Sequence, residues 1–387
     1  MKMMAIAGPS GRESAIMRFI TEALCRAGLA KSAFKFDHAH RHSLFEGCCG
    51  NLIVKLPGTG RLRRAPRRLL MAHVDTVPIC VASKPVRQGG WIRSGRHDTG
   101  LGADNRSGAA AVLHAAVSIL EKKLAHPPLT LLWTVQEEVG LIGARHVSIR
   151  DLGKPRLAFN FDSGAPEKLI IGATGAYRMT IDVEGIASHA GVHPDMGVSA
   201  VVIASLAIAQ LHKDGYLGTV CKGRRTGTSN IGVIQGGQAT NVVTPHVRLA
   251  AELRSHNPTF RNVILDRFRR AFQRAARQVR NKAGACGKIR FDVRIDYEAF
   301  KLNRREAAVV VARDAAQAVT GRTPEMTIVN GGLDANWLTC RGIATVTLGA
   351  GQHGAHTVDE VLNISEFLGG CRMAVRLATA TDEPASP

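Results

Sequence analysis

The sequence has 387 residues, more than one hydrophobic core comfortably supports, so two domains are expected. Apolar residues make up 45% of the chain and charged residues 21%, as in globular proteins, and no run of about 20 apolar residues predicts a membrane span. The formal net charge of +20 could indicate nucleic-acid binding, but the basic residues form separate patches without interleaved aromatic residues. We therefore expect neither membrane nor nucleic-acid binding, and interpret the charge as a solvated basic surface that would favour anionic substrates.

The cysteines and the N-terminus bear on the cellular compartment. The eight cysteines are scattered and include no C-x-x-C pair, which favours reduced thiols over a disulfide framework. The apolar stretch before Gly8 is too short for a secretory signal. Both features predict a cytoplasmic protein.

Residues 1–173 show the pattern of an α/β domain. A helix is expected over 11–27, capped by Ser10 or Ser14, followed by paired strands at 51–56 and 68–73. Because strands then alternate with helices and end in polar residues, we expect a mainly parallel sheet with helices on both faces. The further elements expected here are a Gly-rich loop at 100–108, a helix at 109–120, and strands at 129–135 and 157–161.

The pattern changes after residue 173 and returns after residue 299. Residues 174–299 predict the order β-α-β-β-α-β, a ferredoxin-like α+β unit inserted into a discontinuous domain of residues 1–173 and 300–387. The polar tail 381–387 is expected to be disordered. The elements expected in the insert are strands at 177–184, 229–234, 247–253 and 289–297 and helices at 198–211 and 258–280; those after it are helices at 305–319 and 364–379 and strands at 327–329 and 344–348.

Polar residues gather at the ends of the expected strands of the discontinuous domain. They are His73, Asp75, Asp104, Glu137, Glu138, Asp162 and His356. Residues two apart on a strand share a face, so the carboxylate of Asp75 would lie beside His73 and could fix its tautomer as a metal ligand. So many carboxylates would repel one another without cations, and a set of His, Asp and Glu without Cys fits two divalent ions such as zinc, manganese or cobalt. Of the adjacent Glu137 and Glu138, one could bind metal while the other acts as a base.

Five motifs in this order resemble the M20 family of dinuclear zinc peptidases over nearly the whole chain. They are His73-Val-Asp75-Thr-Val-Pro, Gly102-Ala-Asp104, Gln136-Glu137-Glu138-Val-Gly140, Phe161-Asp162 and Gly351…His356…Glu360. The segments Gly331-Gly-Leu-Asp334-Ala-Asn336 and Gly354-Ala-His356-Thr are most similar to the peptidase T-like branch. The resemblance implies a zinc-binding α/β domain with an inserted lid that forms a homodimer.

The resemblance also implies a role for each strand-end residue. The implied metal ligands are His73 and Asp162 on one ion, Glu138 and His356 on the other, and Asp104 bridging the two. Asp75 would orient His73, and Glu137 would be the general base for a water that bridges the ions. Asn105 departs from the family pattern, because relatives often have an acid at this position.

A second family shares the metal core. The segment that begins at Gln136 also resembles the M42 aminopeptidases, in which the inserted domain lies between the first His and the bridging Asp. Here His73 and Asp104 are too close for an inserted domain, and the insert follows Asp162. The position of the insert therefore favours M20.

The insert contributes three candidate residues. The segment Ser188-His189-Ala-Gly191 resembles the M20 lid motif, whose His enters an active site of the dimer. Asn241 and Arg254 match lid positions that hold the carboxylate end of the substrate. Other interpretations stay open: His189 could be an ordinary loop residue, Asn241 could only shape a turn, and Arg254 could pair with a surface acid. Asp334 could be structural, and no chemistry is assigned to it.

The predicted function is metal-dependent hydrolysis of small peptides, of the di- or tripeptidase and aminopeptidase type. Alternatives are an M20-type amidohydrolase acting on N-acyl or N-carbamoyl amino acids, or a carboxypeptidase, because these enzymes share the metal core. A non-catalytic basic binding protein is a third class. It is disfavoured because the whole ligand set and Glu137 are present.

Overall fold

The computed structural model describes residues 1–379, which divide into two compact units. Unit 1 comprises Met1–Ala173, Phe300–Val329 and the chain from Leu333 onward, and unit 2 comprises Thr174–Ala299 with Asn330–Gly332. The predicted tail 381–387 lies outside the described residues. No helix among the described residues has the length and apolarity that a membrane crossing requires.

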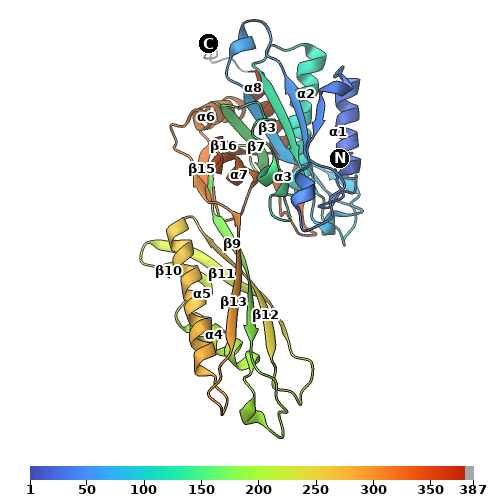
Figure 1. Cartoon of the computed structure of the whole chain (residues 1–387). Coiled ribbons are helices and arrows are strands. Elements are labelled where there is room, and N and C mark those ends of the chain that lie inside the picture. The colour runs from blue at the N-terminus through green and yellow to red at the C-terminus, as the bar shows by residue number, and fades with distance from the viewer. Residues whose placement is uncertain (380–387) are drawn as a thin grey trace. The chain divides into compact units, whose positions relative to one another are not determined.

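Unit 1 is built on a mixed sheet that is nine-stranded within the described residues, in the order β1-β2-β6-β3-β7-β16-β8-β14, with β15 also paired to β8 (Figure 1). Its central strands β6, β3, β7 and β16 are parallel, and the strands outside them are mostly antiparallel. The strands are β1 (Phe34–Phe36), β2 (Leu52–Leu56), β3 (Arg68–His73), β6 (Leu129–Thr134), β7 (Leu157–Ser163), β8 (Lys168–Ala173), β14 (Phe300–Lys301), β15 (Glu325–Val329) and β16 (Thr345–Gly349).

Helices and a small second sheet complete unit 1. The small sheet is antiparallel, in the order β17-β18-β5-β4. Its strands are β4 (Pro85–Gln88), β5 (Trp91–Ser94), β17 (Gln352–His353) and β18 (Val361–Asn363). The helices are α1 (Ser14–Arg26), α2 (Ala103–Lys122), α3 (Ile142–His146), α6 (Ala307–Thr320), α7 (Asp334–Cys340) and α8 (Ile364–Thr379).

The large sheet is covered on both faces, and nearly every residue of its central strands is buried. On β3, Leu70 and Ala72 join the core formed with α1, α2, α6 and α8, whereas Leu69 and Met71 join a second core that includes Leu338 of α7. This alternation follows from the two-residue period of a strand. The expected α/β fold with helices on both faces is confirmed.

Three local predictions for unit 1 are wrong. Helix α2 begins at Ala103, inside the segment 100–108 expected to be a loop, although the backbone at Asp104 and Asn105 is not helical. Helix α1 has Glu13 at its N-cap without a side-chain capping bond, and Ser10 donates instead to Asp75 at 2.7 Å. Strands β2 and β3 do not pair with each other, because β6 lies between them and pairs with both. Strands that are consecutive in the chain were expected to pair, but β6, which comes later in the chain, lies between β2 and β3 in the sheet.

Unit 2 contains a five-stranded antiparallel sheet in the order β10-β11-β12-β9-β13 (Figure 1). Without the edge strand β10, the order is that of the ferredoxin-like fold. Strand β10 is not predicted by the sequence pattern, and the basic Lys222–Arg225 run forms its turn into β11. The elements are β9 (Gly175–Glu184), α4 (Ala200–Lys213), β10 (Gly218–Lys222), β11 (Arg225–Gly236), β12 (His246–Ser255), α5 (Pro258–Gln278) and β13 (Lys288–Tyr297).

Helices α4 and α5 pack against one another and against this sheet. Asn257 caps α5, accepting the Phe260 N–H at 3.0 Å, and Pro258 stands in the first turn, where its missing N–H costs nothing. The apolar face of α5 is buried in the core of unit 2, with Phe260, Phe268 and Phe272 fully covered.

Candidate metal centre

Three adjacent parallel strands of unit 1 end side by side, and each delivers a polar residue to the same edge of the sheet. His73 is the last residue of β3, Asp162 lies near the end of β7, and Glu137 follows β6 after two further residues. The carboxyl ends of parallel strands are where open α/β sheets bind ligands. The strand-end residues predicted from the sequence therefore come together.

His73 lies at the centre of this cluster and is almost completely buried. Its Nδ1 faces the carbonyl oxygen of Asp75 at 3.2 Å and the Asp75 carboxylate at 3.4 Å. Its Nε2 faces Asp104 Oδ1 at 3.2 Å, Asp162 Oδ1 at 3.5 Å and Glu137 Oε2 at 4.0 Å. Because Nδ1 contacts Asp75, Nε2 is the nitrogen that could bind a metal ion among the carboxylates of Asp104, Asp162 and Glu137.

The buried Asp75 carboxylate holds the segment that follows β6. Its Oδ1 accepts the Glu137 N–H at 3.0 Å, and its Oδ2 accepts the Glu138 N–H at 3.2 Å and the Ser10 hydroxyl at 2.7 Å. One carboxylate thus touches His73 and fixes the backbone of both glutamates. Asp75 therefore helps to position His73, Glu137 and Glu138.

The remaining candidate residues gather around Asp104, in the first turn of α2. Asp104 Oδ1 faces His73, while its Oδ2 lies 3.5 Å from Nε2 of His356. The same His356 nitrogen lies 2.9 Å from Glu138 Oε2. Asp104 therefore stands between the two histidines, as expected of a residue predicted to bridge two ions.

The charges of this cluster are strongly coupled. Burial opposes the charged form of His73, but Glu137 and Asp162 outweigh it and raise the pKa of His73 well above its ordinary value. Burial raises the pKa of Glu137 well above its ordinary range, with the negative charge of Asp162 adding to the shift. Hydrogen bonds to Asp104 and Glu138 raise the pKa of His356 to about 10. The carboxylates thus stabilise the positively charged forms of His73 and His356.

The donor set fits divalent cations. Two groups of three ligand atoms lie within 4.8 Å of one another: His73, Asp104 and Glu138, and His73, Glu137 and Asp162. Carboxylate oxygens and imidazole nitrogens without sulfur suit zinc, manganese or cobalt. The five carboxylates of Asp75, Asp104, Glu137, Glu138 and Asp162 outnumber the two imidazoles here, so divalent cations would stabilise their charged forms.

Two further residues bind the cluster although no role for them follows from the sequence. Gln352 donates to Asp104 Oδ1 at 3.1 Å and to Asp162 Oδ1 at 3.4 Å, and accepts the Ser107 hydroxyl at 3.0 Å. Glu360 accepts the backbone N–H groups of Gly102 and Asp104 at 2.6 and 2.8 Å. Gln352 follows the buried strand β16, so the strand-end criterion that selects Asp162 could also have found it.

Asn105, where the family pattern often has an acid, has a structural role in this chain. Its Nδ2 donates to the carbonyl of Phe161 at 2.8 Å, and its Oδ1 accepts the Gly108 N–H at 3.0 Å. These bonds join the start of α2 to the end of β7, and an amide serves both because it donates and accepts.

Asp334, to which the sequence assigned no chemistry, is fully buried at the start of α7. Its Oδ2 accepts the Thr134 hydroxyl at 2.5 Å. Burial raises the pKa of Asp334 to about 7, and the nearby Asp162 adds to the shift. Asp334 thus anchors the re-entry of the chain to the end of β6.

In unit 2, His189 and Asn241 lie on paired segments. The Asn241 carbonyl accepts the Ala190 N–H at 2.9 Å. His189 is exposed, and its Nδ1 accepts the N–H groups of Gly191 and Val192, each at 3.2 Å. Because Nδ1 is an acceptor in both bonds, the neutral ring carries its proton on Nε2, which is left as an exposed donor.

Arg254 on β12 pairs with an acid, which is the alternative left open by the sequence. Its guanidinium donates to both carboxylate oxygens of Glu252 at 3.0 Å, and one further N–H reaches the carbonyl of Asn330 at 3.3 Å. The side chain is half-buried and held in place by these bonds. Carboxylate docking by Arg254 stays a prediction.

Glu13, a residue outside the predicted set, supports the metal centre through Gln136. It is fully buried, and its Oε1 accepts the N–H groups of Gly11 at 2.8 Å and Gln136 at 3.2 Å. Burial raises its pKa from 4.5 to about 7, and the negative charge of Asp75 adds to the shift.

The raised pKa of Glu13 makes stability depend on pH. Because the pKa is higher in the folded than in the unfolded chain, the contribution of the protonated carboxyl is complete below pH 4.5 and is lost as pH rises through 7. The neutral isostere in Glu13→Gln keeps the acceptor oxygen. We expect the variant to gain about 2 kcal/mol in unfolding free energy relative to the parent between pH 5 and pH 8.

This expectation is checked by urea unfolding of the reduced, metal-free proteins at both pH values. Glu46→Gln, at an exposed position close to Cys48, is the matched control and should show no such change. A difference between Glu13→Gln and the parent that is the same at pH 5 and pH 8 would show that Glu13 does not titrate in this range.

The fold and the cluster together define a metal-dependent hydrolase. The model of the family described as "Peptidase family M20/M25/M40" matches residues 69–380, and the chain belongs to this family. The match confirms the M20 family that the sequence motifs predicted.

Solved structures and a sequence relative are similar over most of the chain. A tripeptidase from Staphylococcus aureus subsp. aureus Mu50 is 30% identical, with a TM-score of 0.85, and covers 98% of this chain and 95% of its own. The aminopeptidase PepT from Bacillus cereus ATCC 10987 is 29% identical, with a TM-score of 0.83 and coverage of 98% and 96%. Acetylornithine deacetylase from Myxococcus xanthus is 31% identical over 342 residues, 82% of this chain and 80% of its own.

Proposed function

We propose that the protein is a dinuclear metallopeptidase that removes the N-terminal residue from short peptides. The observation that carries the proposal is the cluster of His73, Asp104, Glu137, Glu138, Asp162 and His356 around the carboxyl ends of strands β3, β6 and β7. The likeness to a tripeptidase and an aminopeptidase over nearly the full chain favours peptides with a free amino end.

Two divalent ions, zinc in the first place and cobalt or manganese otherwise, would occupy this cluster. His73 and Asp162 would hold one ion, Glu138 and His356 the other, and Asp104 would contact both, since its oxygens face the two histidines separately. When bound, such ions act as Lewis acids that polarise a carbonyl and lower the pKa of water.

Glu137 is the proposed general base. Its Oε2 lies farther from His73 Nε2, at 4.0 Å, than the oxygens of Asp104 and Asp162, so its carboxylate is the one least committed to that imidazole. Asp75 fixes its backbone. Glu137 takes a proton from the attacking water and delivers it to the nitrogen of the leaving amine.

Unit 2 is the proposed lid and dimerisation domain. The exposed Nε2–H of His189 would donate to the oxyanion, in its own or in the partner's site, while Asn241 and Arg254 would hold the substrate carboxylate. Exposed apolar residues on α4, namely Val201, Val202 and Leu206, support a homodimer through this unit.

Unpaired cysteines support a reducing compartment such as the cytoplasm.

An acylated amino-acid substrate is the second candidate, because the deacetylase relative covers most of the chain. The metal-loaded protein should be offered an unblocked tripeptide, its N-acetyl derivative, its C-terminal amide, and N-acetyl and N-carbamoyl amino acids. We expect release of the N-terminal residue from the unblocked peptide, at least about 100-fold faster than any cleavage of the N-acetyl peptide.

Each result of this panel selects a function. Preferential hydrolysis of the N-acyl or N-carbamoyl amino acids would replace the peptidase proposal with the amidohydrolase, and release of the C-terminal residue would indicate a carboxypeptidase. Light scattering on the same preparation should give twice the chain mass of 41.4 kDa. A mass of 41.4 kDa would contradict the dimer.

A further inference from the structure

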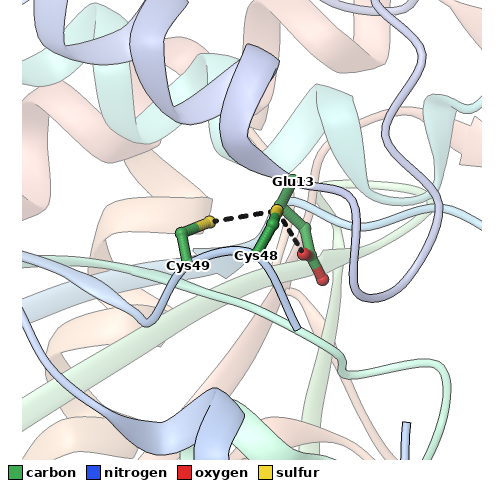
Figure 2. A group of neighbouring side chains, drawn as sticks. All are labelled: Glu13, Cys48 and Cys49. Carbon is green, nitrogen blue, oxygen red and sulfur yellow. Dashed lines mark hydrogen bonds between the residues drawn. The ribbon is translucent and has the colours of Figure 1, made fainter. Parts of the chain in front are cut away.

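A second group of metal-ligating side chains lies in unit 1, apart from the carboxylate cluster. Cys48 and Cys49 stand in the loop before β2, and Glu13 stands at the N-terminal end of α1 (Figure 2). All three ligand atoms lie within 4.8 Å of one another. Cys48 and Glu13 meet although 35 positions separate them in the chain, so the fold builds the group.

The distances approach those of a tetrahedral thiolate site. The two Sγ atoms are 3.9 Å apart, and Cys48 Sγ lies 4.0 Å from Glu13 Oε2 (Figure 2). With Zn–S bonds of about 2.3 Å and a Zn–O bond of about 2.0 Å, a tetrahedron places two sulfurs about 3.8 Å apart and sulfur and oxygen about 3.5 Å apart. A contraction of roughly 0.5 Å would bring Cys48 Sγ and Glu13 Oε2 to this spacing, and a carboxylate oxygen of Glu13 and Cys49 Sγ lie within 4.8 Å of each other.

The surroundings also favour an occupant with positive charge. Glu13 is a buried carboxylate whose Oε1 is engaged by two backbone N–H groups, so Oε2 is the oxygen that faces Cys48. Cys48 is exposed, which gives an ion a path from solvent. The Ser14 N–H and hydroxyl donate to Cys48 Sγ at 3.4 and 2.9 Å and hold the sulfur toward Glu13.

We propose that Glu13, Cys48 and Cys49 bind one soft divalent cation, zinc or cadmium, as a site additional to the carboxylate-rich pair. Both sulfurs and Glu13 Oε2 are the protein ligands, and water takes the fourth position. Two thiolates select thiophilic ions, whereas the carboxylate cluster contains no sulfur. The two sites therefore differ in their donor atoms, and the thiolate site should favour cadmium more strongly than the carboxylate cluster does.

Binding at this site releases protons. A thiol binds a cation as the thiolate, so each cysteine must lose its proton when the cation binds. Affinity should therefore increase with pH. Glu13 Oε1 can stay on Gln136 while Oε2 binds, so occupancy leaves the segment that carries Glu137 in place.

The test is a cadmium titration of the reduced protein already loaded with two equivalents of zinc. Sulfur-to-cadmium charge-transfer absorption in the ultraviolet reports only thiolate ligands. We expect the band to saturate at one equivalent per chain in the parent and to be lost in Cys48→Ser/Cys49→Ser, with peptidase activity unchanged. Cys221→Ser/Cys340→Ser, which removes two exposed cysteines elsewhere, should keep the band.

Absence of the band in the parent, or its persistence in Cys48→Ser/Cys49→Ser, would overturn the proposal. If that double variant does not fold, alkylation of the parent followed by peptide mass analysis decides. Cadmium should protect Cys48 from iodoacetamide and leave the labelling of Cys221 unchanged. Equal labelling of Cys48 with and without cadmium would also contradict the site.

Discussion

The Glu137→Gln variant is expected to lose peptidase activity by about 10³-fold while it keeps both metal ions. Glutamine has the shape of glutamate but cannot accept a proton from water, so the chemical step fails. The ligand atoms of His73, Asp104 and Asp162 and the backbone bond to Asp75 stay in place. The loss should therefore fall on kcat, with little change in KM.

Steady-state kinetics on an unblocked tripeptide and metal analysis of the same sample check this expectation. Glu121→Gln, at an exposed position on α2, is the matched control and should retain full activity and metal. Near-parental kcat in Glu137→Gln would refute the assignment of the base. Loss of one metal equivalent would instead show that Glu137 is a ligand.

The gathering of the candidate metal ligands could be predicted because several of them are local features of the sequence, whereas their individual roles are implied by the resemblance to the M20 family. His73 and Asp162 each stand at the end of an apolar run of strand length, and adjacent parallel strands place their carboxyl ends at the same edge of the sheet. Gly102-Ala-Asp104 is also local: it lies in the Gly-rich segment expected directly before a helix, and in the structure the helix already begins at Ala103. These features need no knowledge of tertiary contacts.

Residues that act through a distant partner could not be predicted in the same way. Glu13 supports the centre through a bond to Gln136, and Ser10 through a bond to Asp75. Both stand at the start of α1, where a sequence pattern suggests only helix capping. Their partners lie more than 60 positions away in the chain.

The predicted pairing of strands β2 and β3 was wrong for a related reason. An apolar run specifies that a strand is buried but does not specify its neighbour. Strands β2 and β3 are consecutive in the chain, yet β6 lies between them, because the sheet places its parallel strands at the centre. In unit 2, the short β10 has too few apolar residues to stand out from the turn that follows it.

The Asp104→Asn variant is expected to lose both metal ions, and with them at least about 10⁴-fold in kcat/KM. Asp104 alone among the described ligands has one oxygen toward His73 and the other toward His356. Asparagine has one oxygen and no charge, so it cannot neutralise two cations. Without the ions, the substrate carbonyl would not be polarised and the pKa of the attacking water would stay high, so Glu137 could not take its proton.

Fold integrity should survive this change, because Glu360 holds the backbone N–H of residue 104 rather than its side chain. Metal analysis after dialysis, circular dichroism and tripeptide kinetics are the measurements. Asp98→Asn, at an exposed residue paired with Arg96, is the matched control and should keep two ions. If Asp104→Asn retained two ions per chain, Asp104 could not be the bridge. Loss of only one ion would place Asp104 on a single metal, with His356 and Glu138 or His73 and Asp162 sufficient for the other.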